Sequence, residues 1–271
     1  MPAFDHAVQL GANMLEIDVQ ETKDSVIVVS HDNDMYRATG KKGLISETLY
    51  ADLPPYSNHL FLQFDRVQCI SSQTDFSFVK LADLFEHHKD VIIHIDTKDG
   101  KPSLINTVSE LVIKHDRFSN TVWGNMAEAK NDLSYSVNPD ITLFMSIRKV
   151  ALTYAMFYLG LIGFVPMKEA VFDIPMPSAI VDQFSDVLSR GQKVLAYTAH
   201  FLIMNRLLFW HLRRRGVKVV VFVLNQEKNF VIADKYCVDG IMTDFPSRLV
   251  KYHSDNCSES GETSQILGNV S

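Results

Sequence analysis

"MLEIDVQETKDSVIVVSHDNDMYRATG", residues 14–40, opens with a run typical of a buried β-strand that nevertheless carries two carboxylates. Because side chains alternate between the faces of a strand, Met14, Glu16 and Asp18 project together and the aliphatic residues between them project oppositely. A second apolar run, "VIVVSHD", ends with His31 and an aspartate. The segment therefore predicts two strands with a group of polar side chains near their ends.

Strand-like and helix-like segments alternate along most of the chain, which is typical of βαβ units around a parallel sheet. Runs typical of strands lie at 14–19, 26–30, 91–96, 121–123, 141–146, 170–174, 217–224 and 240–243. Amphipathic patterns typical of helices lie at 79–88, 102–116, 202–216 and 226–237. Residues 50–78 lack periodicity and are expected to form a long loop or an inserted segment. We predict one α/β domain over 1–252 and a disordered polar tail over 253–271.

Composition narrows the classes of protein to consider. The 271 residues are 46% hydrophobic, which is enough to bury a sizeable core, and α/β barrels reach this length as single domains. The 26 basic and 32 acidic residues give a net charge of −6, so we expect no nucleic-acid partner. The three cysteines are odd in number and far apart, which predicts no disulfide framework and favours a reducing compartment.

One apolar segment, 150–167, has no charged residue and is flanked by Arg148, Lys149 and Lys168. Its length is at the lower limit for a membrane-spanning helix. Because a span here would separate the two halves of a barrel, we expect a helix that packs on the barrel or lies in a membrane interface. The membrane surface is the partner predicted for this segment, and an ordinary buried helix is the alternative.

Carboxylates that share an inward strand face repel one another and lose hydration unless a cation or hydrogen-bond donors compensate them. Glu16 and Asp18 form such a pair, and in "VIIHIDTKDG" the side chains of His94, Asp96 and Lys98 share a face by the same alternation. Hard divalent ions such as Mg²⁺ and Ca²⁺ prefer oxygen ligands. The three carboxylates are therefore available to one ion, although a salt-bridged or exposed edge strand would also explain Glu-x-Asp alone.

The other polar groups suit chemistry on a phosphate ester. Lys98 can offer an ammonium to an anionic substrate, and His31 can act as an acid or base near neutral pH. A bound ion would polarise a phosphoryl oxygen while the histidine moves a proton to or from an alcohol oxygen. We expect His94 to fill the barrel, and we assign no chemistry to His87 and His88 at the end of a helix.

Motifs from most of the chain are shared with one known family. "LEIDVQETKD…VIVVSHD…RATG" resembles the glycerophosphodiester phosphodiesterase family, "HIDTK" is similar to its next ligand strand, and "DGIMTDFP" to its closing strand. Many members have glutamate where Asp96 stands. "TVWGN", "GLIGFVP", "DIPMPS" and "VFVLNQE" resemble its animal membrane-associated branch of lysophospholipases D. The resemblance reaches from about the first residue to Tyr252 and implies a TIM (β/α)8 barrel of the phosphatidylinositol-phosphodiesterase-like type.

The resemblance also implies the roles of individual residues. The metal ligands for one Mg²⁺ or Ca²⁺ would be Glu16, Asp18 and Asp96. His31 would be one of two acid/base histidines, Lys98 would contact the phosphate, and Phe222 would lie beside the glycerol, where the family often has tryptophan.

The activity implied is metal-dependent hydrolysis of a glycerophosphodiester to glycerol phosphate and an alcohol. For a lysophospholipid substrate the products would be lysophosphatidic acid and choline, ethanolamine or an N-acylethanolamine. We expect such a protein in the cytoplasm and at the endoplasmic reticulum or another intracellular membrane.

One departure from the family pattern matters. The family begins with a strand bearing His-Arg-Gly, and "MPAFDHAVQLGANMLEIDV" matches only the end of the helix that follows it. His6 lies in that helical part and, with Asp5, is expected to form a solvated helix face. We expect a shortened, catalytically weak form of an active phosphodiesterase, probed by comparing choline release from the short and extended chains. The alternatives are a membrane-associated protein that binds lysolipid without turnover and a metal-dependent lyase or aldolase on the same barrel.

Overall fold

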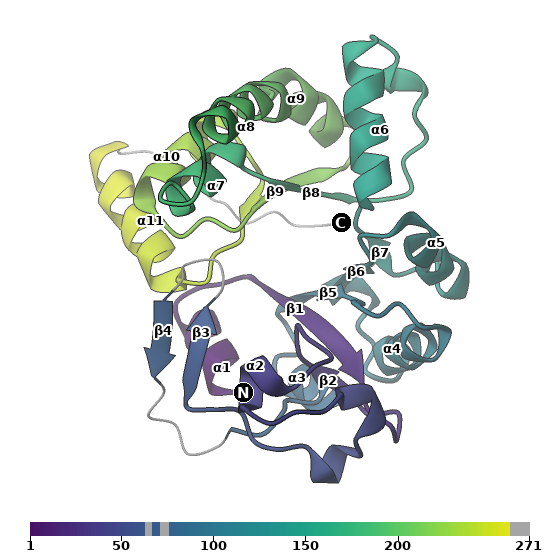
Figure 1. The fold of residues 1–271 in the computed structure, drawn as a ribbon. Helices are drawn as coiled ribbons and strands as arrows, with labels where there is room; N and C mark the ends of the chain where they lie inside the picture. Colours follow the sequence, from purple (N-terminus) through teal and green to yellow (C-terminus); the bar gives the residue numbers. More distant parts are fainter. Residues whose placement is uncertain (63–66, 71–75, 261–271) are drawn as a thin grey trace.

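The computed structural model describes residues 1–62, 67–70 and 76–260, in which strands alternate with helices (Figure 1). The strands are β1 (Met14–Glu21), β2 (Ile27–Val29), β3 (His59–Leu62), β4 (Val67–Ile70), β5 (Ile92–Asp96), β6 (Thr121–Gly124), β7 (Thr142–Leu143), β8 (Val171–Pro175), β9 (Lys218–Phe222) and β10 (Gly240–Ile241). The α-helices are α1 (Pro2–Gln9), α2 (Tyr36–Thr39), α3 (Leu81–His87), α4 (Pro102–Lys114), α5 (Glu128–Val137), α6 (Ile147–Tyr158), α7 (Pro177–Gln183), α8 (Arg190–Ile203), α9 (Arg206–Arg214), α10 (Glu227–Tyr236) and α11 (Pro246–Ser260). The 3-10 helices are η1 (Ile45–Glu47), η2 (Tyr50–Asp52), η3 (Phe118–Asn120) and η4 (Ile162–Phe164).

Parallel pairing arranges the main strands in one series. The order β1–β5–β6–β7 forms one part and β8–β9–β10 the other. A parallel bridge between Phe144, directly after β7, and Val171 of β8 joins the two parts. This order follows the sequence with helices between the strands, as in a TIM barrel, so the predicted fold is confirmed. Each of the runs predicted to be strands contains an observed strand.

The two ends of the series lie at β1 and β10. Strand β2 pairs antiparallel with the last residues of β1, from Val19 to Glu21. Within the described residues, no strand pairs with the free edge of β1 before Val19 or with the outer edge of β10.

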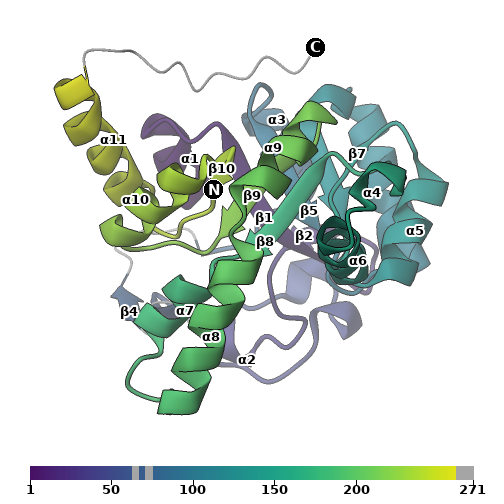
Figure 2. The same ribbon diagram turned by 90° about the horizontal axis from the view of Figure 1, so that it is seen from above.

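Aliphatic side chains that face outward from the strands hold the helices on the barrel. Leu15 and Ile17 of β1 and Ile93 of β5 are buried in one cluster with residues of α3 and α4. A second cluster joins β8 and β9 to α9 and α10. Burying each large aliphatic side chain stabilises the fold by about 1.5–3 kcal/mol. Figure 2 shows α4 and α5 outside one part of the series and α10 and α11 outside the other.

The apolar segment 150–167 forms most of α6 and all of η4. Helix α6 begins after Ser146, whose hydroxyl accepts a hydrogen bond from the Lys149 backbone N–H. It packs through partly buried Val150, Tyr154 and Phe157 against the cluster around β8 and β9. Among the residues described, no helix combines the length and apolar character that crossing a bilayer would require.

A single helical pattern at 202–216 proves to be the end of one helix and the whole of another. Helix α8 stops at Ile203, and α9 begins after Asn205, whose side-chain oxygen accepts hydrogen bonds from the Leu207 and Leu208 backbone N–H groups. Asparagine is a strong N-cap because its oxygen satisfies otherwise unpaired helix donors. The sequence did not predict α8.

Two irregular segments contain more regular structure than the sequence predicted. Within 50–78, expected to be a loop or insertion, lie η2 and an antiparallel hairpin of β3 and β4. Helix α11 continues past 252 to Ser260, so the first part of the tail predicted to be disordered is helical. The remainder of that tail, 261–271, lies outside the described residues.

Arg117 ties the turn after α3 to the start of β6. Arg117 is 2% exposed, and its guanidinium donates hydrogen bonds to the backbone carbonyls of His88, Lys89, Val91 and Asn120. Because these acceptors belong to different backbone segments and are buried or partly buried, the one side chain stabilises several segments at once.

Replacing Arg117 with methionine should lower the free energy of unfolding by about 3 kcal/mol, since the four carbonyls lose a charged donor. Urea unfolding of Arg117→Met and of Lys114→Met, an exposed substitution at the end of α4, measures the difference. Arg117→Lys should be intermediate because an ammonium cannot reproduce the planar fork. An Arg117→Met variant as stable as Lys114→Met would contradict this assignment.

Candidate active site

The inside of the barrel changes from apolar to polar along the strands. Near their amino ends, Met14, Ile92, Val122, Val171 and Val220 pack together. Residues two or four positions further along the same strands include Glu16, Asp18, His94, Asp96, Asp173 and Phe222. Because alternate residues share a face, these side chains follow the apolar layer toward the carboxyl ends, where TIM barrels carry their sites.

Two of the predicted metal ligands contact the ammonium of Lys98. The parallel register places Asp18 opposite Asp96 and Glu16 opposite His94. The Lys98 Nζ lies 2.9 Å from Asp18 Oδ1 and 2.7 Å from Asp96 Oδ2. The other oxygen of Asp96, Oδ1, is buried without a hydrogen-bond partner among the described residues. The structure thus brings Glu16, Asp18, Asp96 and Lys98 together, while their roles stay predictions.

The pKa values reveal an excess of negative charge. The Glu16 side chain keeps contact with solvent, but surrounding protein and the neighbouring Asp18 carboxylate raise its pKa to about 7. Burial likewise raises the pKa of Asp96, against the opposing effect of Lys98. Burial alone would lower the pKa of Lys98, but Asp18 and Asp96 outweigh it and raise that pKa. One ammonium therefore compensates the carboxylates only in part.

A buried ion pair crosses the barrel next to these carboxylates. The His94 Nε2 lies 2.9 Å from Asp173 Oδ2, and the imidazole stacks on the Phe144 ring at 4.8 Å between centroids. Burial opposes protonation, yet Asp173 outweighs it and raises the pKa of His94. The sequence predicted that His94 fills the barrel but missed its partner, although the aspartate inside the apolar run "VFDIP" was a signal.

The predicted acid/base residue, His31, is held by the carboxylate of its neighbour in the chain, Asp32. Its Nδ1 lies 2.6 Å from Asp32 Oδ1, and the Arg37 Nε donates to the other oxygen of Asp32. Burial acts to raise the pKa of Asp32, but these two hydrogen bonds prevail and lower it. An ionised Asp32 can fix the tautomer and orientation of the imidazole. Asp32 and Arg37 both lie in the sequence motif at 14–40, but no role was predicted for either residue.

The backbone brings His31 to the same end of β1 as the metal ligands predicted there. The Ser30 backbone N–H donates to the Asp18 carbonyl at 2.9 Å, and half of the His31 side chain remains exposed. Among the described residues, no ion pair or hydrogen bond links the His31 imidazole to Glu16, Asp18 or Asp96. A bound ligand would have to connect His31 with these carboxylates.

Buried amides fix the strand end that carries Asp96 and Lys98. The Asn125 side chain donates to the Thr97 carbonyl at 2.6 Å, and the Thr97 hydroxyl donates to the Gly124 carbonyl at 2.8 Å. Asn131 accepts from the Asn125 backbone N–H and donates to the Phe144 carbonyl. These contacts join the ends of β5, β6 and β7, so they stabilise the position of Asp96 without touching it.

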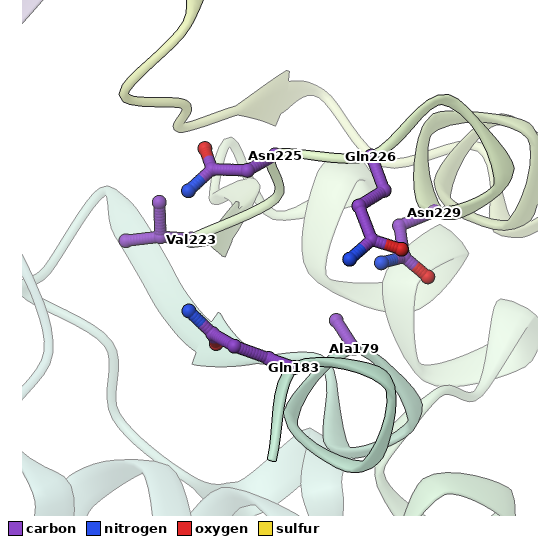
Figure 3. A pocket seen from close by; sticks show the side chains of 6 residues that line it. All are labelled: Ala179, Gln183, Val223, Asn225, Gln226 and Asn229. Atoms are coloured by element: carbon purple, nitrogen blue, oxygen red, sulfur yellow. The ribbon is translucent and has the colours of Figure 1, made fainter. Parts of the chain in front are cut away.

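Phe222, the predicted glycerol contact, is the half-buried last residue of β9. Directly beyond it lies a small pocket lined by α7, the β9–α10 turn and α10 (Figure 3). Its lining residues are Ala179, Gln183, Val223, Asn225, Gln226 and Asn229. Four side-chain amides therefore lie at the carboxyl end of β9, and none of them was predicted from the sequence to be a site residue.

A parallel α/β barrel with carboxylates, a lysine and a histidine at its carboxyl ends defines a class of barrel hydrolases acting on phosphate esters. The model of the "Glycerophosphoryl diester phosphodiesterase family" matches residues 1–248. The chain belongs to this family, which is a family of phosphoric diester hydrolases, and the predicted resemblance is confirmed.

Curated relatives point the same way. The chain is 40% identical over 253 residues to the rat protein "Lysophospholipase D GDPD1", covering 93% of this chain and 80% of that protein. It is 30% identical over 265 residues to the human "Lysophospholipase D GDPD3", covering 97% and 83% respectively.

Solved structures support the fold. A glycerophosphodiester phosphodiesterase from Thermotoga maritima matches with a TM-score of 0.60 at 20% identity, covering 92% of this chain and 89% of that one. A phosphodiesterase from Oleispira antarctica, solved in complex with the product sn-glycerol-3-phosphate, matches with a TM-score of 0.60 at 15% identity, covering 93% and 90%.

The raised pKa of Glu16 predicts how stability depends on pH without divalent ions. Unfolded, the carboxyl titrates near 4.5, so between that pH and about 7 the folded chain binds more protons and stability falls as the pH rises. Glu16→Gln should therefore raise the melting temperature at pH 8 in chelator and have little effect near pH 4.5. Glu110→Gln, an exposed substitution on α4, is the control. Parallel pH profiles for all three chains would contradict the argument.

Proposed function

We propose that the chain is a divalent-cation-dependent phosphodiesterase that hydrolyses glycerophosphodiesters, including lysophospholipids. The products would be glycerol phosphate or lysophosphatidic acid and an alcohol such as choline. The observation that carries the proposal is the contact of Asp18 and Asp96 with Lys98, beside Glu16 on the same strand as Asp18, in a chain of this family. The names of its curated relatives support the lysophospholipid substrate.

The donor chemistry of these residues fits a hard divalent cation. Glu16, Asp18 and Asp96 supply only oxygen ligands, and Asp96 Oδ1 is buried without a hydrogen-bond partner among the described residues. In the part of the chain that the structure describes, their oxygens do not all lie within 4.8 Å of one another, so the carboxylates would have to draw closer around an ion. The raised pKa values of Glu16 and Asp96 indicate that positive charge is lacking. A bound Mg²⁺ or Ca²⁺ would supply Lewis-acid polarisation of the phosphate. With the carboxylates neutralised in this way, Lys98 would be free to bind a phosphate oxygen.

His31 is the best-placed group for proton transfer. Asp32 holds its Nδ1, which leaves Nε2 to exchange a proton with the leaving alcohol or the attacking water. His94 is less suited because Asp173 engages its Nε2 and the ring is buried against Phe144. The glycerol part would lie beside Phe222, where the neighbouring amides offer donors and acceptors for hydroxyl groups.

Hydrolysis of lysophosphatidylcholine by the full chain tests this proposal through release of choline. We expect activity that requires Mg²⁺ or Ca²⁺, is abolished by Glu16→Ala, and falls about a hundred- to ten-thousand-fold in His31→Gln. Glu110→Ala should leave the rate unchanged. Equal rates with chelator and with added cation would sink the metal-dependent mechanism.

An exposed apolar surface supports the proposed membrane partner. Leu159 and Phe164, at the end of α6 and in η4, are 69% and 81% exposed, and Phe201 of α8 is 78% exposed. The Tyr158 hydroxyl donates to the Leu202 carbonyl at 2.6 Å, which places the ends of α6 and α8 side by side. We propose that this surface lies in the lipid interface and delivers lipid substrate, and that the protein occupies the cytoplasm and intracellular membranes such as the endoplasmic reticulum.

Polar substitution of this surface should weaken binding to lipid vesicles. Leu159→Ser with Phe164→Ser should lower vesicle partition about tenfold or more, because each exposed side chain could bury apolar area in the interface. Ile113→Ser, on the exposed face of α4, is the matched control. If the double variant sediments with vesicles as well as the control does, this surface is not the membrane contact.

A second candidate is a protein that binds lysolipid without turnover. Lys98 forms ion pairs with Asp18 and Asp96, and Asp173 pairs with His94. Groups already paired in this way are expected of a site that has lost its catalysis. Retained lysolipid binding with no choline release at saturating Mg²⁺ or Ca²⁺ would favour this alternative.

A further inference from the structure

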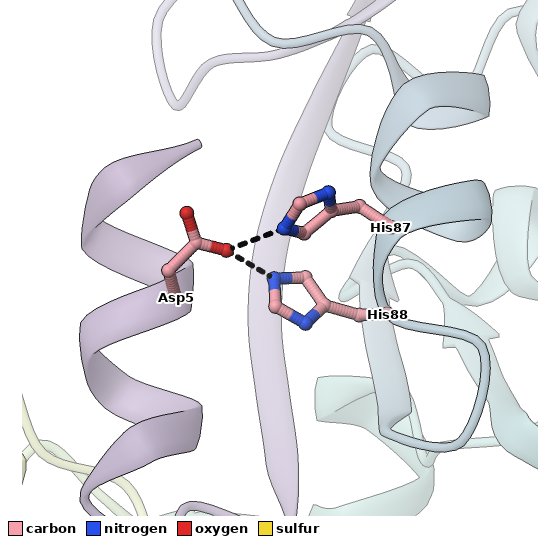
Figure 4. A group of neighbouring side chains, drawn as sticks. All are labelled: Asp5, His87 and His88. Carbon is pink, nitrogen blue, oxygen red and sulfur yellow. Dashed lines mark ion pairs between the residues drawn. The ribbon is translucent and has the colours of Figure 1, made fainter.

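Three side chains of metal-ligand type converge at a place remote from the barrel carboxylates (Figure 4). Asp5 comes from α1, His87 from the last turn of α3, and His88 from the residue that follows it. The Asp5 Oδ1 lies 2.9 Å from His87 Nε2 and 3.1 Å from His88 Nε2. All three atoms lie within 4.8 Å of one another.

These contacts are short, but they are not aligned as a satisfied hydrogen-bond network. Asp5 Oδ1 and His88 Nε2 are both buried, and they face each other as an ion pair rather than through an aligned hydrogen bond. One carboxylate oxygen that faces two imidazole nitrogens can accept from both only if both nitrogens carry a proton, and a shared cation is the other arrangement that satisfies all three atoms. In a tetrahedral zinc site with bonds of about 2.0–2.1 Å, neighbouring ligand atoms are about 3.3 Å apart. The two separations from Asp5 Oδ1, 2.9 and 3.1 Å, are close to that value, and the two imidazole nitrogens lie within 4.8 Å of each other.

The chemistry of the three groups selects the kind of metal. Each imidazole can offer a nitrogen lone pair and the carboxylate an oxygen, so the three side chains supply two nitrogen donors and one oxygen donor. Two imidazoles and one carboxylate suit Zn²⁺ and similar transition ions, whereas Mg²⁺ and Ca²⁺ favour oxygen ligands. The His88 side chain is 8% exposed and that of His87 55%, so solvent can reach an open coordination position.

We propose that Asp5, His87 and His88 bind one Zn²⁺ ion, with water completing its coordination. The site is separate from the proposed catalytic one, because His88 precedes β5 whereas Asp96 ends it, and the strand lies between them. It joins α1 to α3. Phe4, Ala7 and Val8 of α1 pack on the core but are only partly buried, so a metal bond would add to the contacts that hold this helix.

Zinc titration of the full chain after chelator treatment tests the proposal. We expect one saturable Zn²⁺ site by calorimetry, and a higher melting temperature when it is filled. His87→Gln and Asp5→Asn should each weaken the affinity about a hundredfold or more and abolish the rise in melting temperature. His6→Gln, on the exposed face of the same helix, should bind Zn²⁺ like the unaltered chain.

Co²⁺ identifies which site is occupied, because a site with nitrogen ligands and low coordination absorbs visible light far more strongly than a six-coordinate oxygen site. The strong absorption should persist in Glu16→Ala and disappear in His87→Gln, whose position is exposed enough to leave folding intact by circular dichroism. The proposal is overturned if no Zn²⁺ binds, if His87→Gln binds it as tightly as the unaltered chain, or if Glu16→Ala alone removes the site. A hydrogen-bonded cluster without metal would give the first of these results.

Discussion

The contact of the Lys98 ammonium with Asp18 and Asp96 is the interaction on which the arrangement of the site depends. Two unit charges about 4 Å apart interact by about 4 kcal/mol at the effective dielectric typical of a protein surface. Three carboxylates at one end of a barrel therefore need positive charge, and a single lysine supplies one unit. The part left uncompensated appears as the raised pKa values of Glu16 and Asp96.

This shortage of positive charge is confined to one end of the barrel, so the end that stabilises the fold differs from the end that carries the candidate site. Toward the amino ends of the strands, Val122, Val171 and Val220 fill the interior with apolar contacts. At the carboxyl ends, ionisable groups replace them, and burying such groups without full compensation costs stability. Such a cost is expected where a site is adapted to bind a charged ligand rather than to stabilise the empty protein.

Local periodicity is what made part of this site predictable. The alternation in "MLEIDV" and "VIIHID" placed Glu16, Asp18 and Asp96 on inward faces, because strand geometry fixes side-chain direction within a few residues. The Asp173 partner of His94 lies on a strand far along the chain, and no short-range pattern encodes that pairing. Asp5 is likewise far along the chain from His87 and His88, so its sequence surroundings predict only a solvated helix residue, although folding brings the three together.

Helix boundaries were harder to predict than strands. The N-cap Asn205 separates α8 from α9 within one continuous amphipathic pattern, and the hairpin of β3 and β4 depends on pairing between its strands rather than on a strong local pattern. Propensity and periodicity are weak where a single cap or a cross-strand pair decides the local structure.

Strand β1 links the barrel carboxylates to the proposed zinc ligands. Helix α1 leads directly into this strand, and α3 leads into β5, its parallel neighbour. A bond between α1 and α3 would therefore restrain the two strands at their amino ends, and the same register places Asp18 opposite Asp96 at the other end. Because β1 has no strand partner on its other edge before Val19 within the described residues, this part of the strand depends on β5 and on the core cluster that α1, α3 and α4 share. Fastening α1 is thus a means of holding the carboxylates in register from outside the barrel.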